Sequence, residues 1–300
     1  MADAPVSQPS PAHRGPHGLP AVAEALWQAL QADWPGFSVE VLPEIDSTNT
    51  ELMRRARGGL CDPVLLVAER QTAGRGRLGR AWASAPGDSL TFSIGVPLAP
   101  ADWSGLSLAV GVALAEALDP APDGVPSPLR VGLKWPNDLW LADRKLAGIL
   151  IETASAGGPG AAPASAARCA VVGIGINLAT PEASGLSTPP AGLREIWPDA
   201  TVAQVLQRVV PAVMQALRAF ERAGFGPARE RFAARDVLRG RRVCLSDGRE
   251  GAACGVDLGG ELLVQTPTGL ERVASSEVSV RPQSGREPGA GPGVQPAARA

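Results

Sequence analysis

The sequence predicts an α+β fold that ends in a small β-barrel, and three observations support this class. Between residues 19 and 238, apolar segments with helical spacing alternate with short apolar runs that are typical of strands. From Arg241 onward the pattern changes to short alternating strands joined by Asp-Gly and Gly-Gly turns, as in a small barrel. A hydrophobic content of 45% in 300 residues, with a formal net charge of -2, is sufficient for one large domain and a small one. We therefore expect a larger domain at residues 19–238 and a barrel at residues 239–283.

Both ends of the chain are expected to be disordered. Residues 1–18 are rich in Pro, Gly and Ser, and residues 284–300 are rich in Gly, Pro and Ala. The N-terminal segment has no cationic stretch followed by an apolar one, so it does not resemble a secretory signal. The longest apolar stretch, residues 106–118, contains Glu116 and is too short to span a bilayer. We expect a cytoplasmic protein with no membrane partner.

The first elements follow from spacing and capping. Residues 19–33 have the apolar spacing of a helix, and residues 37–42 have the pattern of a strand. Thr48 is expected to cap the next helix, because Glu51 follows three residues later and completes a capping box. This helix is expected to stop at the Gly58-Gly59 pair.

The remaining elements follow from apolar runs and their lengths. Further helices are expected at residues 103–118, 201–223 and 227–235. The strands of the larger domain are expected at residues 64–68, 90–96, 131–135, 139–141, 146–153 and 170–176. Those of the barrel are expected at residues 243–246, 251–258, 261–265, 271–274 and 278–281. The Gly/Ala/Pro/Ser segment 154–167 is expected to be a flexible hairpin connection.

The histidines and cysteines exclude several kinds of site. Both histidines, His13 and His17, lie in the predicted N-terminal tail, so we expect no histidine in the folded part. This excludes Ser-His-Asp and Cys-His catalysis and histidine metal sites there. The four cysteines, at positions 61, 169, 244 and 254, form no CxxC pair and are expected to be small core residues. No protein-bound metal site is predicted.

The two lysines of the chain are candidate functional residues. Lysine occurs only at positions 134 and 145, although Lys and Arg together number 28. In an arginine-rich chain, a retained lysine indicates a place that needs a compact ammonium group on a flexible stem. Chance in an arginine-biased composition is the alternative.

The segment QTAGRGRLGRAW, at residues 71–82, is the densest group of candidate functional residues. Three glycines let the backbone approach a ligand closely, while three arginines can bind phosphate or carboxylate. The segment matches G-x-G-x-x-G, but a dinucleotide site needs a helix directly after the glycines, and here we expect a loop and then a strand from Leu90. A basic loop that binds nucleic acid is a second alternative, which the net charge of -2 disfavours.

Three further segments carry candidate residues. In KWPND, Lys134 is expected to be partly exposed at a strand end, where it can meet a carboxylate or phosphate, while Asn137 and Asp138 could be turn residues only. In RKLAGILIE, Gly148 interrupts a strand, which often marks close approach of another group to the backbone. In GIGINL, the Asn177 amide could bind a ligand, with plain strand packing as the alternative.

Together these residues predict a site with cationic loops, polar groups and no acid/base histidine. Such a site suits chemistry that depends on positioning and charge neutralisation. Attack on a nucleotide α-phosphate, followed by transfer of the activated acyl group, is one candidate.

The segments resemble the biotin protein ligase family, biotin-[acetyl-CoA-carboxylase] ligase. Over roughly residues 45–178, the STN, GRGRxGRxW, KWPND, KLAGIL and GIGIN segments occur in the family's order. The resemblance implies a mixed sheet with helices, related to the lipoyl transferases, followed by an SH3-like barrel. It also implies the reaction: ATP, with Mg2+, and biotin form biotinyl-5'-AMP and pyrophosphate. A lysine of a biotin carboxyl carrier protein, the carrier of acetyl-CoA carboxylase, then takes the biotin.

The resemblance also implies roles for individual residues. It places the ureido ring of biotin at the helix start, and the carboxylate and phosphate at the loop and at Lys134, which contacts both. The implied biotin-binding residues are Ser47, Thr48, Asn49, Gln71, Gly74, Arg75, Gly76, Arg77, Lys134 and Gly148. The implied ATP-binding residues are Arg75, Arg77, Arg80, Trp82 (as a stacking face for adenine), Lys134 and Asn177. Lys134 and Arg77 are the implied catalytic residues, and Glu277 and Arg281 of the barrel are implied to help ATP binding.

The sequence departs from the bifunctional members of the family in its N-terminal region. Those members have a winged helix-turn-helix ahead of the catalytic domain, whereas 44 residues precede Ile45 here. We therefore expect a monofunctional ligase with no DNA partner. A lipoate or octanoate ligase or transferase and a non-catalytic biotin-binding regulator are the alternatives. An edge strand such as residues 170–176 could pair with a second copy in a homodimer.

Overall fold

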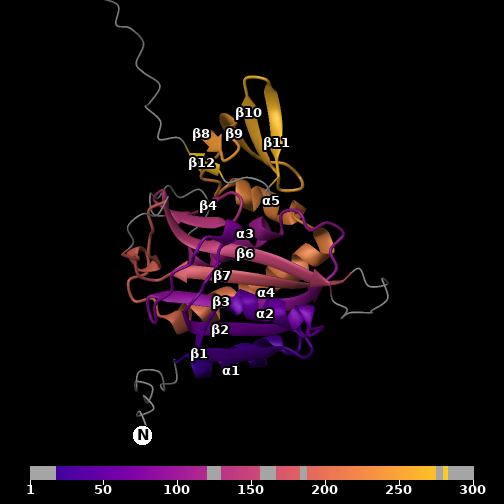
Figure 1. Cartoon of the computed structure of the whole chain (residues 1–300), viewed down its shortest axis with the longest axis vertical. Helices are drawn as coiled ribbons and strands as arrows, with labels where there is room; N and C mark the ends of the chain where they lie inside the picture. Colours follow the sequence, from indigo (N-terminus) through magenta and orange to yellow (C-terminus); the bar gives the residue numbers. More distant parts are fainter. Residues whose placement is uncertain (1–17, 120–129, 156–166, 183–187, 275–279, 283–300) are drawn as a thin grey trace, which may run out of the picture.

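A computed structural model describes residues 18–119, 130–155, 167–182, 188–274 and 280–282 (Figure 1). The predicted tails lie outside these residues except for Gly18, and so does most of the predicted connection at 154–167. The predicted α+β class, with a mixed sheet, helices and a second small sheet, is confirmed. Within the described residues, no helix is long and apolar enough to cross a membrane.

A seven-stranded mixed sheet forms the centre of the larger part of the molecule. Its strands are β1 (Ser38–Ile45), β2 (Val64–Gln71), β3 (Ser89–Leu98), β4 (Val131–Lys134), β5 (Asp138–Leu141), β6 (Arg144–Ser155) and β7 (Arg168–Asn177). Their order is β1-β2-β3-β7-β6-β5-β4, in which only the β1/β2 pair is parallel. The expectation that residues 170–176 form an edge strand is wrong, because β7 pairs with β3 on one side and with β6 on the other.

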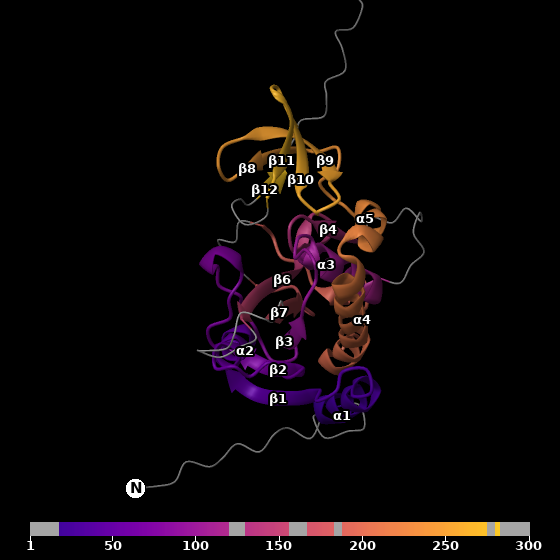
Figure 2. The same ribbon diagram turned by 90° about the vertical axis from the view of Figure 1, so that its right-hand side faces the viewer.

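Helices cover the sheet from both sides. They are α1 (Leu19–Leu30), α2 (Thr48–Arg57), α3 (Leu106–Leu118), α4 (Val202–Ala223) and α5 (Gly226–Ala233). Figure 2 shows α2 on the opposite side of the sheet from α1 and α4. The core divides accordingly: a small cluster beneath α2 includes Leu52, Met53 and Val171, and a large cluster fills the other face. The face under α2 is therefore only partly covered by apolar side chains.

The start of α2 differs from the sequence prediction. Ser47, not Thr48, is the N-cap, and its hydroxyl accepts a hydrogen bond from Thr50 N at 3.3 Å. Thr48 is the first helical residue, so its side chain is free to leave the helix end and join the site described below. Glu51 makes no capping box and instead pairs with Arg54 and Arg55.

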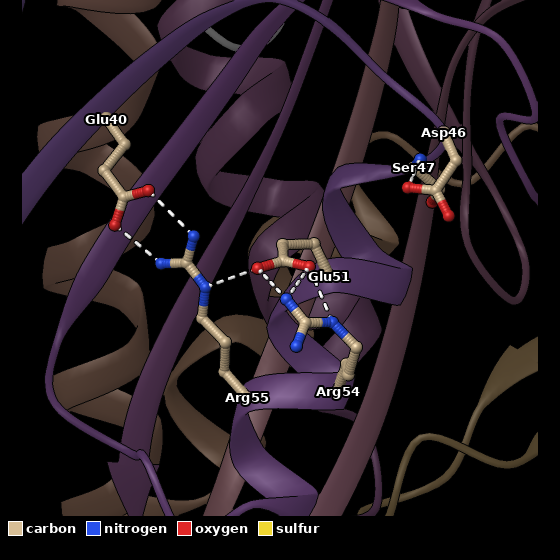
Figure 3. A network of polar contacts seen from close by, with 6 residues as sticks. All are labelled: Glu40, Asp46, Ser47, Glu51, Arg54 and Arg55. Atoms are coloured by element: carbon tan, nitrogen blue, oxygen red, sulfur yellow. Dashed lines mark hydrogen bonds and ion pairs between the residues drawn. The ribbon is translucent and has the colours of Figure 1, made fainter.

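The Glu51 carboxylate belongs to a polar network on the outer side of α2 (Figure 3). Arg55 pairs with Glu51 at 2.7 Å and with Glu40 of β1 at 2.6 Å. These contacts raise the pKa of Arg55, and the hydrogen bond from Arg54 lowers the pKa of Glu51. The network ties α2 to the edge strand β1.

The predicted helix at 103–118 starts three residues late, at Leu106. Gly105, which precedes it, has a φ of +79°, a conformation that glycine adopts without strain but that no α-helix continues. The remaining helices and strands begin and end within a few residues of the predicted bounds.

A five-stranded antiparallel sheet follows α5. It contains β8 (Arg242–Leu245), β9 (Glu250–Val256), β10 (Leu262–Thr266), β11 (Gly269–Val273) and β12 (Val280–Pro282), in the order β11-β10-β9-β8-β12. Figure 1 shows this sheet, in orange and yellow, at one end of the molecule, as expected for an SH3-like C-terminal domain. The Trp135 indole donates a hydrogen bond to Gly260 O at 3.0 Å and so joins the β4–β5 turn to this sheet.

Candidate active site

Three glycines on two neighbouring strands leave a bare patch on the sheet beneath α2, which we name the glycine floor: Gly148, Gly173 and Gly175. Gly148 pairs with Gly175 across β6 and β7, so both lie on the same face. A Cβ atom at Gly173 would lie 2.4 Å from Asn49 Oδ1, and one at Gly175 would lie 2.3 Å from Trp82 Cε2. Side chains from α2 and from the 71–82 loop therefore rest directly on strand backbone, which any larger residue would prevent.

Neutral polar side chains surround the Gly173 end of the floor. Gln71 Oε1 accepts hydrogen bonds from Thr48 N at 2.8 Å and from Thr48 Oγ1 at 3.1 Å. The Thr48 hydroxyl also lies 2.8 Å from Ser93 Oγ, and Ser93 Oγ donates to Asn49 Oδ1 at 3.1 Å. The structure thus brings together the three predicted groups Thr48, Asn49 and Gln71, and Ser47 caps the same helix turn. We call this group the neutral end.

Ser93 is a buried member of the neutral end that the sequence prediction missed. Its residue type gives no signal within an apolar strand, and only its pairing with Gly173 places it beneath α2. Because it contacts both Thr48 and Asn49, it fixes the orientation of two side chains at once.

Glu152 on β6 joins the neutral end to the arginine loop. Asn49 Nδ2 donates to Glu152 Oε2 at 2.6 Å, and Arg75 Nη2 pairs with the same oxygen at 3.1 Å. Arg75 Nε also donates to Thr50 Oγ1 at 3.0 Å. In this structure Arg75 is therefore paired with Glu152 and Thr50, and its contact with biotin and ATP stays a prediction.

The 71–82 loop folds back on itself as a tight hairpin. Trp82 N donates to Gly74 O at 2.8 Å, and Gly76 N donates to Arg80 O at 2.7 Å. A Cβ atom at Gly74 would lie 2.5 Å from Trp82 O, so this close approach requires glycine. A short 3-10 turn, Arg77–Gly79, follows Gly76, and β3 is the next strand. This agrees with the prediction of a loop and then a strand, and it does not fit a dinucleotide-binding turn, which needs a helix at this point.

Four cations gather around one carboxylate at the Gly175 end of the floor, which we call the cationic end. Lys145 Nζ lies 2.7 Å from Asp138 Oδ1. Lys134, Arg77 and Arg80 are also near enough for their charges to affect one another. Burial lowers the pKa of Arg77, and its Nη1 reaches Asn137 Oδ1 at 3.4 Å. Positive charge exceeds negative charge here, which suits a ligand with more than one negative charge.

The expectation that Lys134 is partly exposed is wrong. Only 8% of the residue is exposed, and its ammonium lies 5.5 Å from the centre of the Trp140 ring. The pKa of Lys134 is lowered to about 8, mainly by burial, with a smaller contribution from the nearby cations, while Asp138 opposes the decrease. The ammonium group therefore remains charged at neutral pH, although burial and the nearby cations destabilise the charged form. A bound anion would stabilise it.

Lys145 is the lysine that reaches over the glycine floor. Its Nζ lies 5.7 Å from the centre of the Trp82 ring and would lie 3.3 Å from a Cβ atom at Gly148. The sequence prediction named it only as the second lysine, although its rarity was the available signal. Trp82 Nε1 beside it is buried and has no hydrogen-bond partner among the described residues.

The remaining predicted site residues are Asn177, Arg281 and Glu277. Asn177 Nδ2 donates to Lys145 O at 3.3 Å and to Ala191 O at 3.2 Å, so this amide nitrogen holds backbone in place. Its contact with a nucleotide or magnesium stays a prediction. Arg281 is exposed on β12, and Glu277 lies outside the described residues. Within the described ranges, no three His, Cys, Asp or Glu side chains form a group that could hold a metal ion.

The site therefore has two chemically different ends on one floor. Hydroxyl and amide groups at one end can hydrogen-bond a neutral polar ring. Cations at the other end can bind carboxylate and phosphate groups and stabilise negative charge that develops between them.

Comparison with known proteins gives consistent matches. Residues 41–177, which contain the floor and both of its ends, match the model of the biotin/lipoate A/B protein ligase family. The chain is 36% identical over 253 residues to the bifunctional ligase/repressor BirA of Escherichia coli, covering 82% of this chain and 75% of that protein. It is 33% identical over 251 residues to the biotin--[acetyl-CoA-carboxylase] ligase of Paracoccus denitrificans, covering 79% of this chain and 98% of that protein. The structure of the biotin protein ligase from Aquifex aeolicus in complex with biotin and ATP matches with a TM-score of 0.66 and 30% identity, over 82% of this chain and 99% of that one.

Proposed function

Because the chain belongs to the biotin/lipoate A/B protein ligase family, we propose that it is a biotin protein ligase. The observation that carries the proposal is the glycine floor with its neutral end and its cationic end. Relatives named as biotin--[acetyl-CoA-carboxylase] ligases and a similar structure that holds biotin and ATP support it.

Biotin is proposed to lie along the floor with its ureido ring at the neutral end. This ring is neutral and carries both donors and an acceptor, which matches the hydroxyl of Thr48 and the amides of Asn49 and Gln71. The ring would lie near Gly173, and the valeryl chain would extend beneath α2 toward Lys145 and Trp82, which cover Gly148 and Gly175. The carboxylate then reaches the cationic end.

The proposed reaction has two steps. In the first, a biotin carboxylate oxygen attacks the α-phosphorus of ATP, the bond to the β-phosphate oxygen breaks, and pyrophosphate leaves with the negative charge. In the second, the ε-amine of a lysine on a biotin carboxyl carrier protein attacks the carbonyl of biotinyl-5'-AMP. AMP leaves, the amine loses a proton, and an amide forms.

This chain's own residues contribute positioning and charge in both steps. Lys145, Lys134 and Arg77 are proposed to bring carboxylate and α-phosphate together and to stabilise the charge on the phosphorus centre. Trp82 is proposed to pack against the adenine ring. The nucleophile of the second step comes from the acceptor, so the enzyme needs no nucleophile of its own.

Mg2+ is proposed to accompany ATP. Such an ion is commonly held by one or two carboxylates together with substrate phosphates, and Asp138 is the carboxylate at the cationic end that could serve. The ion would supply further charge neutralisation for pyrophosphate. Asp138 would exchange its pairing with Lys145 for the ion.

The polar side chains of the neutral end favour biotin over lipoate. A dithiolane ring has no group that hydrogen-bonds well, so it would gain nothing from the polar groups of Thr48, Asn49 and Gln71, whereas the ureido ring would.

The test is incubation of the protein with ATP, Mg2+ and a biotin carboxyl carrier domain, with biotin and lipoate in parallel, followed by the mass of the acceptor and release of pyrophosphate. A mass increase of one biotin, only with biotin, is expected. An acceptor whose target lysine is replaced by arginine is the control. Biotin binding without pyrophosphate release would instead indicate a non-catalytic regulator. Transfer of lipoate in place of biotin would indicate a lipoate ligase.

A further inference from the structure

Glu152 lies outside the groups so far proposed to contact biotin or ATP, yet it connects two of them. It accepts from Asn49 at the start of α2 and pairs with Arg75 of the 71–82 loop, both through Oε2. Its side chain is 26% exposed and that of Arg75 is 43% exposed, so the pair is at the border of the site and not in the core.

The position of this contact in the sheet is informative. The loop leaves the end of β2, whereas Glu152 is on β6, and β3 and β7 lie between these two strands. The contact between Arg75 and Glu152 therefore passes across two strands on the face beneath α2. The partner of Glu152 on β7 is Val171, two residues from Gly173 of the floor, so the crossing lies beside the proposed biotin ring.

The partners of Arg75 differ from those of the other cations. Arg75 is bound by one carboxylate and by the Thr50 hydroxyl, at 3.1 Å and 3.0 Å. Lys134 and Arg77 share the charge of Asp138 with Lys145, and Arg80 lies near both of them. Arg75 is therefore paired with a carboxylate of β6 and does not belong to the cationic end.

We infer that Glu152 is a positioning residue that latches the 71–82 loop over bound biotin and biotinyl-5'-AMP through Arg75. The inference rests on the proposed function for its ligand. Glu152 holds the Asn49 amide by one hydrogen bond and the 71–82 loop by an ion pair. The neutral end, where the biotin ring is proposed to bind, and the loop over it therefore share one carboxylate. A closed latch slows the escape of the reactive adenylate until the acceptor lysine arrives.

The variant Glu152→Gln separates these two contacts. The amide keeps an oxygen that can accept from Asn49, but it loses the charge that pairs with Arg75. We expect biotinyl-5'-AMP to dissociate from the loaded enzyme about tenfold faster, because one charge-assisted hydrogen bond is lost. The KM for biotin is expected to rise, while kcat for pyrophosphate release changes less than the dissociation rate.

Two further variants make the test specific. Arg75→Gln is expected to speed dissociation by the same factor, and the double variant is expected to be no faster than either single one, because both remove the same contact. Glu44→Gln is the matched control, since it breaks an exposed pair with Arg70 on β1 and β2 away from the floor. Its dissociation rate is expected to equal that of the unchanged protein.

Hydrogen exchange of the loop amides tests the latch without any ligand. In Glu152→Gln, exchange at residues 74–82 is expected to be faster than in the unchanged protein, while exchange in β2 and β3 is the same. An unchanged adenylate dissociation rate, or effects of Glu152→Gln and Arg75→Gln that multiply in the double variant, would overturn the latch and leave the ligase proposal standing. If the unchanged protein forms no adenylate, the ligase proposal fails, and faster loop exchange in Glu152→Gln would still support the contact as the loop's latch.

Discussion

The two ends of the glycine floor satisfy their polar groups in opposite ways. At the neutral end, Thr48, Asn49, Gln71 and Ser93 hydrogen-bond to one another before any ligand is present. At the cationic end, Lys145 pairs with Asp138, and Lys134, Arg77 and Arg80 lie near enough for their charges to affect one another. One end is thus ordered by hydrogen bonds among its own side chains, and the other gathers positive charge that suits an anion.

Under the proposed function, this difference would let one face bind an acid and activate it. A preformed hydrogen-bonding end loses little entropy when the ring binds and fixes where the carboxylate points. An end with excess positive charge stabilises negative charge best when that charge is greatest, which is at the pentavalent α-phosphorus. Changes at the cationic end should therefore affect the rate of adenylation, and changes at the neutral end should affect biotin binding.

The largest effect is expected from removing the ammonium group that lies over the floor. Lys145→Met keeps an apolar stem near Trp82 and Gly148 but removes the charge, so pyrophosphate release is expected to fall by about 100-fold or more. Biotin binding, measured by calorimetry without ATP, is expected to change far less. Arg70→Met, on the far side of the sheet order, is the control. A rate for Lys145→Met within threefold of the unchanged protein would remove this lysine from the mechanism.

The two glycines of β7 allow the ends to be changed separately. Gly175→Ala would bring a methyl group against the Trp82 ring and is expected to raise the KM for ATP about tenfold, a free energy of about 1.4 kcal/mol. Gly173→Ala would do the same to the Asn49 amide, which Ser93 and Glu152 hold in place, and is expected to raise the KM for biotin.

Steady-state kinetics with each substrate varied in turn measure both effects. Gly226→Ala is the matched control, because no atom lies within 4 Å of its Cβ position. If both floor variants raised the same KM by the same factor, the ends would not be separate.

Sequence patterns predict the fold well and the site in part, for a physical reason. Element positions depend on local spacing of apolar residues, so β2, α4 and the barrel strands were placed within a few residues. The contacts of Ser93 and Glu152 depend on strand pairing over tens of residues, and nothing local to either residue reports it. The prediction of Thr48 as the N-cap of α2 was wrong by one residue. Serine and threonine are both preferred at this position, so the sequence alone does not decide between Ser47 and Thr48.

The low pKa of Lys134 predicts a pH effect at the cationic end. Its pKa in the folded protein, about 8, lies below the ordinary lysine value of 10.5. Above pH 8 the folded protein loses this charge, so adenylation is expected to fall about threefold between pH 7.5 and pH 8.5. Between pH 8 and 10.5 the unfolded chain binds the proton that the folded one has lost, so the same group makes the free energy of unfolding increase with pH.

A pH profile of pyrophosphate release at saturating ATP and biotin checks the first effect, and urea unfolding checks the second. Lys134→Arg is expected to remove the decline, because arginine stays charged over this range. Lys134→Met is expected to release pyrophosphate slowly at every pH, with no decline in rate around pH 8. The same decline in all three proteins would show that another group titrates.

The smallest effect is expected from the pairing of Arg55 with Glu40 and Glu51 on the outer side of α2 (Figure 3). Glu40→Gln removes the ion pair between β1 and Arg55, whose two side chains are 36% and 27% exposed, so the free energy of unfolding is expected to fall by about 0.5 kcal/mol. Arg55 keeps its pairing with Glu51, and the first turn of α2 keeps its own bonds to Gln71 and Ser93. Urea unfolding of this variant should therefore show a lower free energy of unfolding, while steady-state kinetics should show an unchanged KM for biotin. The contrary outcome is a KM for biotin that rises more in Glu40→Gln than in Gly173→Ala. It would mean that the neutral end is ordered by the contacts on the outer side of α2, and not by the hydrogen bonds among its own side chains.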